Sequence, residues 1–330
     1  MASFSQFGND LYTGKRSYDF VGKKYLWYAI ALVLIVAALG ITMLRGGFEF
    51  GIEFRGGSQF EISQAKNLDQ QFATDAVVAE VSTANPRVTI IGGDSVRIQT
   101  DQLTNAENDE VRDALAAAYQ LSPDQVTASF IGATWGADIT STAIRGLVTF
   151  LVLAAIVMAI YFRTWKMSLA AMVALLHDLI ITAGVYGVLQ FEVTPAAVIG
   201  FLTILGYSLY DTVVVFDKIR ENTMEDGSES RRTFGESVNL AVNQTLVRSI
   251  NTSVVALLPV GAILFIGAAL LGAGTLRDIS LALFIGMLVG TYSTIFIAAP
   301  LYAHLRSSED AISKQEKKTL QVRKSAVVAE

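Results

Sequence analysis

GYSLYDTVVVFDKIREN, residues 206–222, begins inside an apolar run and ends in a cluster of charged side chains. The apolar part belongs to a run at 193–216, which is long enough to cross a bilayer as a helix of roughly 20 residues. The run nevertheless contains Asp211, and an ionisable side chain in mid-membrane costs about 2.5–3.5 kcal/mol on insertion scales. The stretch therefore predicts a membrane-spanning helix with a carboxylate that needs a partner or a role.

Apolar runs of this length dominate the chain. Of its 330 residues, 52% are hydrophobic and only 17% are charged, whereas a soluble domain has about 25% charged residues. The composition predicts a multi-pass α-helical membrane protein. Its six expected transmembrane helices lie at 27–44, 144–162, 168–189, 193–216, 252–274 and 279–303.

The basic residues predict the orientation. Seventeen of the 25 Lys and Arg residues fall in segments that share one side of the membrane if the crossings alternate. The positive-inside rule makes that side the cytoplasm. These segments are the N-terminus at 1–26, the turn at 163–166, the segment 218–248 and a basic tail at 306–330.

The segment 45–143 is then extracytoplasmic. It carries 14 acidic and six basic residues, which argues against nucleic acid as a partner because phosphate binding needs a basic face. Its periodicity predicts a β-α-β-β-α-β order, the ferredoxin-like pattern, and Thr104 with Glu107 resembles a capping box. The alternative is an α+β domain of another order. The expected elements are strands at 59–63, 87–91, 95–99 and 126–130, and helices at 68–82 and from 104 onward.

Polar residues form a stripe on the helix that carries Asp211. Tyr207, Ser208 and Thr212 lie within one turn of it, so the four side chains gather toward one side of the helix. The carboxylate either gains and loses a proton or forms a structural hydrogen bond to a neighbouring helix, and the stripe alone leaves both possibilities open.

The start of the fifth apolar run continues this polarity. The polar residues that precede or open the run are Arg248, Asn251, Thr252 and Ser253. Because arginine is not deprotonated in proteins, Arg248 is a candidate fixed charge against which Asp211 titrates. The alternative is an arginine whose charged head reaches the membrane surface.

His177 and Asp178 occupy the middle of the third apolar run. Adjacent helical residues point about 100° apart, so we expect that they do not pair with each other and that one faces the fourth helix. They are candidates for a proton relay or for an interhelical contact. With two histidines and no cysteine in the chain, no metal site, cofactor or disulfide is expected.

Residues 228–248 are amphipathic within the cytoplasmic segment 218–248. This pattern predicts a short helix on the membrane surface. The alternative is an extension of the fifth transmembrane helix.

Several motifs resemble the SecF branch of the SecD/SecF family of the bacterial Sec protein-export machinery. FGIEFRGG at 50–57 is similar to the family's glycine-rich motif, which places Gly51, Glu53, Gly56 and Gly57 in it. The chain departs from the family pattern at Glu53, Ala133 and Tyr210, where Asp, Pro and Asn are usual. The other matching motifs are IGATWGAD (131–138), ALLHD (174–178), GYSLYDTVVVFDKIREN (206–222), NQTLVRSINTS (243–253) and GTYSTIF (290–296).

The resemblance implies half of a fold of the resistance–nodulation–division (RND) superfamily in the bacterial cytoplasmic membrane, with 144–305 forming helices two to six. It implies a SecD partner, contacts with SecYEG and with YajC and YidC, an emerging secreted polypeptide as cargo, and a proton path through Asp211 and Arg248. It also implies that the chain is not an enzyme. The alternative is half of a proton-coupled RND transporter of small solutes. An intramembrane enzyme at His177 and Asp178 is disfavoured because no nucleophile with a matching base accompanies them.

Overall fold

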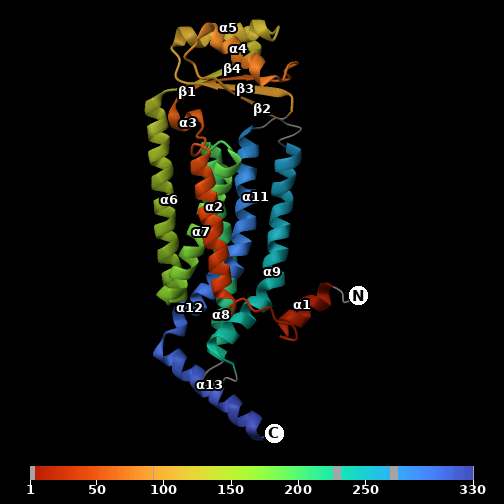
Figure 1. The fold of residues 1–330 in the computed structure, drawn as a ribbon, viewed down its shortest axis with the longest axis vertical. Helices are drawn as coiled ribbons and strands as arrows, with labels where there is room; N and C mark the ends of the chain where they lie inside the picture. The colour runs from red at the N-terminus through yellow and green to blue at the C-terminus, as the bar shows by residue number, and fades with distance from the viewer. Residues whose placement is uncertain (1–3, 92, 226–231, 268–273, 330) are drawn as a thin grey trace.

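The chain forms a bundle of long helices with a small sheet domain at one end, while both termini lie toward the opposite end (Figure 1). We call these the sheet end and the terminal end. The computed structural model describes residues 4–91, 93–225, 232–267 and 274–329.

Six helical segments of the described chain are long and apolar enough to cross a membrane, which confirms the predicted number. The sixth continues through a π-helical turn, η3 (Thr294–Ala298), into α12 (Ala299–Ser307). The others are α2 (Lys24–Leu44), α6 (Ala133–Phe162), α7 (Trp165–Leu189), α8 (Pro195–Glu225), α9 (Phe234–Ala262) with its π-helical end η2 (Ile263–Gly267), and α11 (Gly274–Ser293).

The second membrane helix starts eleven residues earlier than its hydropathy predicts. Residues 133–143, expected to be a linker, are the first turns of α6. Gly136 lets this part pack on the short helix α3 (Ile52–Arg55), because a Cβ at this position would collide with the backbone oxygen of Phe54. The prediction was wrong here because hydropathy marks only the part of a helix that lies in the membrane, and polar residues can extend the helix beyond it.

The amphipathic segment before the fifth span is not a separate surface helix. Thr233 and Glu236 form a capping box, and α9 then continues without a break to Ala262. The prediction of a surface helix was therefore wrong, and the described part of 228–248 extends the fifth span. Residues 226–231, and the part of the predicted span 252–274 at 268–273, lie outside the described residues.

The sheet domain has the predicted ferredoxin-like order. All three strand pairs are antiparallel, and the strand order across the sheet is β2-β3-β1-β4. The capping box of Thr104 and Glu107 is confirmed. The elements are β1 (Gly57–Ile62), α4 (Gln70–Glu80), β2 (Arg87–Ile91), β3 (Ser95–Thr100), α5 (Asn105–Ala118), the 3-10 turn η1 (Pro123–Gln125) and β4 (Val126–Ile131).

The two faces of the sheet have different roles. Phe60, Val96 and Ile98 are fully buried in a core with α4 and α5, which lie on the side of the sheet away from the bundle (Figure 1). The opposite face is polar and rests on the bundle. There Gln99 Nε2 donates to Glu192 Oε1 at 2.6 Å, in the turn between α7 and α8.

The terminal end is closed by both ends of the chain. Helix α1 (Phe4–Tyr12) packs on α9, and α13 (Asp310–Ala329) runs below the bundle (Figure 1). Asn239 and Asn243 of α9 bind the backbone of residues 18–21. Asn239 Oδ1 accepts from the amides of Phe20 and Val21, at 2.8 and 3.2 Å.

Candidate functional site

Asp211 lies in α8, buried against α9. Its side chain is 4% exposed, and its Oδ1 accepts a hydrogen bond from Ser249 Oγ at 2.8 Å. Its Oδ2 is buried and has no hydrogen-bond partner among the described residues. A charged oxygen without a partner inside a membrane bundle is costly, so the site favours occupation by a proton or a water molecule.

Hydroxyl groups continue from Asp211 across three helices. Thr212 Oγ1 lies 3.1 Å from Thr294 Oγ1, so α8 is joined to the sixth span. Tyr207 donates to Ser253 Oγ at 2.9 Å, and this oxygen lies 2.6 Å from Thr291 Oγ1. The stripe predicted on α8 is therefore an interhelical hydrogen-bond network and does not face lipid.

His177 and Asp178 do pair, contrary to the expectation from their positions on the helix. His177 Nδ1 lies 3.2 Å from Asp178 Oδ1. Both side chains are buried. The expectation was wrong because side-chain torsions can bring two adjacent side chains into contact even though their Cα–Cβ bonds diverge. Asp178 also faces the fourth span, as predicted for one of the two, because its Oδ2 accepts from Ser208 Oγ at 2.5 Å.

Gly290 allows the sixth span to approach this contact. A Cβ on Gly290 would lie 3.2 Å from Ser208 Cβ and 3.5 Å from Asp178 Oδ2, which leaves little room for a side chain. Ser208 is one helical turn before Asp211 in α8. The two carboxylates therefore belong to neighbouring parts of one buried polar region.

The structure does not bring every predicted residue into this region. Arg248 is exposed, and among the described residues no ion pair joins it to Asp211. Asn251 is exposed and Thr252 is half-buried. The direct partner of Asp211 on α9 is Ser249, which follows Arg248. The influence of Arg248 on Asp211 stays a prediction.

The sequence reasoning missed three hydroxyl residues of the network. Their signal was present in the motifs NQTLVRSINTS and GTYSTIF, where serine and threonine recur within apolar surroundings. Tyr210, which departs from the family pattern beside Asp211, is 56% exposed and points away from the network. The missed residues are Ser249, Thr291 and Thr294.

Several buried polar atoms in the region have no hydrogen-bond partner in the described part of the chain. Besides Asp211 Oδ2, they are His177 Nε2, Thr182 Oγ1 and Tyr292 Oη. Buried polar groups in folded proteins are almost always satisfied, often by ordered water. A row of carboxylates, hydroxyls and unpaired polar atoms is chemically suited to proton transfer. Among the described residues no cluster of His, Asp and Glu could hold a metal ion.

The glycine-rich motif positions the sheet domain on the bundle. Gly51 N donates to Val193 O at 3.0 Å. Gly56 and Gly57 have φ angles of +79° and +140°, and a Cβ on Gly57 would collide with the carbonyl oxygen of Thr100. Both glycines are therefore required where the chain turns from α3 into β1.

Glu53 of this motif lines a cavity of about 440 Å³ between the sheet and the bundle. Its Oε2 is buried without a hydrogen-bond partner among the described residues. Burial raises the pKa of Glu53, and the charge of Glu192 raises it further. Arg97 is the cation of the cavity and reaches Glu61 and Glu192 at 3.8 and 3.7 Å.

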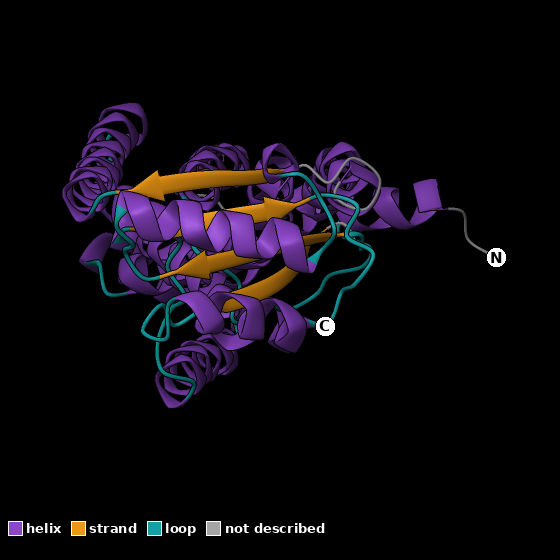
Figure 2. Ribbon diagram, turned by 90° about the horizontal axis from the view of Figure 1, so that it is seen from above, coloured by secondary structure: helices purple, strands orange, loops and turns teal. Residues whose placement is uncertain are grey.

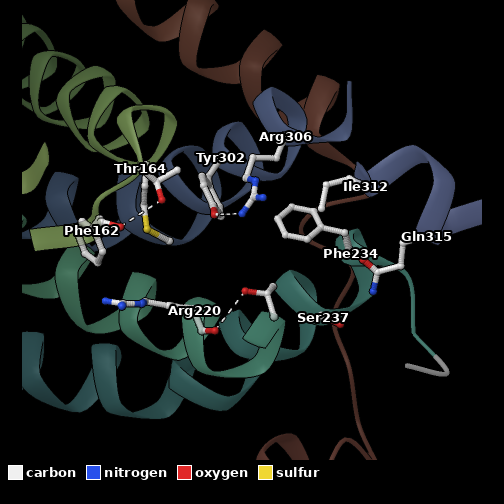
Figure 3. A pocket seen from close by; sticks show the side chains of 11 residues that line it. Phe162, Thr164, Arg220, Phe234, Ser237, Tyr302, Arg306, Ile312 and Gln315 are labelled. Carbon is white, nitrogen blue, oxygen red and sulfur yellow. Dashed lines mark hydrogen bonds between the residues drawn. The ribbon is translucent and has the colours of Figure 1, made fainter. Parts of the chain in front are cut away.

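A second cavity, of about 290 Å³, lies at the terminal end and shares no residue with the polar network (Figure 3). Arg306 and Tyr302 point toward each other on one wall, with Nη1 donating to Tyr302 Oη at 3.0 Å. The guanidinium lies 5.1 Å above the ring centre of Phe234 and pairs with Glu309 at 3.0 Å. These contacts fasten α12 to α9 and to the start of α13.

Comparison with known proteins gives consistent matches. Residues 110–308 match the family model described as "Protein export membrane protein SecD/SecF, C-terminal". Over 97% of its length the chain is 44% identical to the protein translocase subunit SecF of Streptomyces coelicolor, and covers 85% of it. It is 40% identical to that of Mycobacterium tuberculosis, over 96% of this chain and 73% of the relative.

The fold is also that of a solved relative. The crystal structure of SecDF from Thermus thermophilus, described as a translocon-associated membrane protein, matches with a TM-score of 0.76 at 28% identity. The match covers 88% of this chain and 39% of that one. The chain therefore corresponds to about two-fifths of the larger protein.

Proposed function

The chain belongs to the SecD/SecF family of protein-export membrane proteins, and from this premise we propose that it works with a SecD partner and uses the proton-motive force to promote late steps of export. The cargo is a secreted polypeptide that emerges on the far side of the membrane. The activity is mechanical and involves no covalent chemistry on the cargo.

The observation that carries the proposal is the environment of Asp211. Its carboxylate holds α9 through Ser249 and keeps one buried oxygen unpaired. A carboxylate only accepts hydrogen bonds, whereas a carboxylic acid also donates one. Protonation therefore removes a buried charge and adds a donor at the contact between α8 and α9, so that the two helices favour a different packing in each state.

The His177–Asp178 pair serves as a second station in this path. It reaches α8 through Ser208, one turn from Asp211. A histidine can take up a proton on one ring nitrogen and release it from the other. Arg248 precedes Ser253 by about one and a half turns of the same helix and supplies a positive charge at the border of the region.

The available energy is sufficient for a bias between two states. One elementary charge that crosses 100 mV yields about 2.3 kcal/mol, which shifts a two-state equilibrium roughly 40- to 50-fold. A device that needs only a preferred direction for the cargo can work with this bias. The sheet domain follows helix movements because it is attached to α2 through α3 and continues directly into α6.

The terminal end is cytoplasmic in this proposal, in the bacterial cytoplasmic membrane. Both termini lie at this end (Figure 1), and most basic residues of the chain belong to the segments there. The positive-inside rule supports the assignment. The sheet domain then lies outside, where the emerging cargo appears.

The partners follow from the incomplete bundle. Helices α2, α6 and α9 bury few of their residues within this chain, which leaves apolar surface for the six-helix half of SecD. The larger size of the SecDF structure agrees with such a two-part assembly. We further expect contacts with SecYEG, YajC and YidC near the external opening of the translocation channel.

Depletion of the chain in living cells tests the proposal. Secreted precursors should accumulate, and their release should lose its dependence on the proton-motive force. Depletion of an unrelated six-span protein serves as the control. Unchanged export together with the loss of a solute gradient would instead support a small-solute transporter.

A further inference from the structure

The outermost strand of the sheet, β4, has a free edge. The strand order places β4 at the end of the sheet, and β1 is its only strand partner in the described part of the chain. The strand has six residues, which corresponds to an edge of about 20 Å. The edge presents backbone amide and carbonyl groups that no neighbouring strand uses.

This edge lacks the usual protection against a further strand. Natural sheets block their edges with lysine, proline, a bulge or a covering segment. The sequence of β4, VTASFI, contains neither charge nor proline, and its register with β1 is regular from Gly57↔Ile131 to Ile62↔Val126. The other edge strand, β2, follows Pro86 and begins at Arg87, which forms an ion pair with Glu49.

The helix layer covers only the start of β4, where Val126 is buried in the core of the sheet domain. Ala128 pairs with Phe60 and therefore lies on the face that α4 and α5 cover. Phe60 is fully buried, but Ala128 is exposed and Phe130, on the same face, is 47% exposed. Seen from above, the helices leave the strand at one edge of the sheet uncovered (Figure 2). A shallow apolar shelf thus runs beside the free edge.

We propose that the edge of β4 binds the emerging polypeptide as an added antiparallel or parallel strand. The inference rests on the proposed function and names the place and the mode of cargo binding. Strand addition recognises the main chain, so it accepts cargo of almost any sequence, as an export device requires. The side chains of β4 are uncharged and the apolar shelf is small, so they discriminate little between cargo side chains. Because these side-chain contacts are weak, the cargo can dissociate again.

The position of β4 fits a role in holding cargo. The strand ends at Ile131, and α6 begins two residues later at Ala133. A movement of α6 against the other helices therefore moves the bound strand directly. No other strand of the sheet leads straight into a membrane helix in this way, in the described chain.

The absence of native cysteine permits a direct test in the full complex with the SecD-family partner. Thr127→Cys and Ser129→Cys place thiols on β4, and Ser82→Cys places one on an exposed site between α4 and β2. An export intermediate arrested in transit carries single cysteines at successive positions. We expect disulfides from the two β4 sites at least fivefold above those from Ser82→Cys, with a maximum at every second cargo position.

The outcomes are distinct. Equal crosslinking at all three sites, or crosslinking without the two-residue period, overturns strand addition. Crosslinks from β4 to the SecD-family partner instead of the cargo would show that the edge is a subunit interface and also overturn it.

A variant with lysines on the edge strand supplies the second measurement, the rate of export. Thr127→Lys with Ser129→Lys should slow export severalfold at normal chain abundance, while Ser82→Lys leaves export unchanged. Normal export by the double variant contradicts the inference. This measurement does not depend on Asp211. A result that refutes the edge proposal therefore leaves the proton-path proposal standing, and a result that refutes the proton path leaves the edge proposal standing.

Discussion

Asn243→Ala should release the N-terminal segment from the bundle. The side chain of Asn243 is fully buried. It accepts from Tyr18 N at 2.8 Å and donates to Tyr18 O at 2.9 Å and to Asn239 O at 2.8 Å. The two bonds to Tyr18 connect residues 225 positions apart, and so they join the segment before α2 to the helix that carries Ser249.

The expected magnitude follows from these three hydrogen bonds. A typical intramolecular hydrogen bond contributes about 0.5–1.5 kcal/mol, and a buried group left without a partner costs about 1–3 kcal/mol. Truncation to alanine removes all three bonds and leaves the amide of Tyr18 unpaired, while its carbonyl still accepts from Asn239 Nδ2. We expect a loss of about 2–4 kcal/mol in the local stability of residues 17–21.

Hydrogen–deuterium exchange of the peptide that contains Tyr18 and Phe20 measures this loss. A local loss of about 2 kcal/mol corresponds to roughly 30-fold faster exchange. The matched control is Asn251→Ala, on the same helix, because Asn251 is exposed. Exchange in Asn243→Ala within threefold of that in Asn251→Ala would refute the reasoning.

Three further predictions concern packing, pH and topology. Gly286→Ala should destabilise the bundle by about 1–3 kcal/mol, since its Cβ would lie 2.7 Å from two carbons of Ile204; addition of Ile204→Ala should restore part of the loss in a thermal unfolding assay. Burial raises the pKa of Glu53, so its contribution to the free energy of unfolding should be largest below about pH 4.5 and fall as the pH rises through the raised pKa. This pH dependence should vanish in Glu53→Gln, and its persistence in that variant would contradict the reasoning. In cells whose outer envelope has been made permeable, a thiol reagent that does not cross the cytoplasmic membrane should label Ser82→Cys but not Ser308→Cys. The reverse pattern would show that the sheet domain lies in the cytoplasm and would contradict the proposed orientation.

The elements with strong periodicity were predictable. Long apolar runs located the six membrane helices, and alternation with a capping box at Thr104 located the ferredoxin-like order. Hydropathy did not locate the ends of helices that leave the membrane. The polar residues from Ala133 onward and the amphipathic ones from Phe234 onward continue α6 and α9 because packing partners stabilise them there.

The site was predictable in its charged residues and less so in its partners. The cost of a charge in the membrane singled out Asp211 and Asp178. Spacing on one helix could not show that Ser249 rather than Arg248 contacts Asp211, because that depends on how α9 is rotated against α8. The binding of Tyr18 by Asn243 was equally hidden, since polar residues on an amphipathic helix do not reveal a partner so distant in sequence.

Export by Asp211→Asn at matched abundance tests the central claim most directly. The amide preserves the shape of the side chain and accepts from Ser249, but it cannot exchange a proton at neutral pH. Asp217→Asn in the same helix is the control, because Asp217 Oδ2 accepts from Tyr161 and lies nearer the terminal end. The account predicts that Asp211→Asn assembles with its partner and loses the export that depends on the proton-motive force, whereas Asp217→Asn retains it. Full proton-dependent export by Asp211→Asn would contradict the account and leave Asp211 a structural hydrogen-bonding residue.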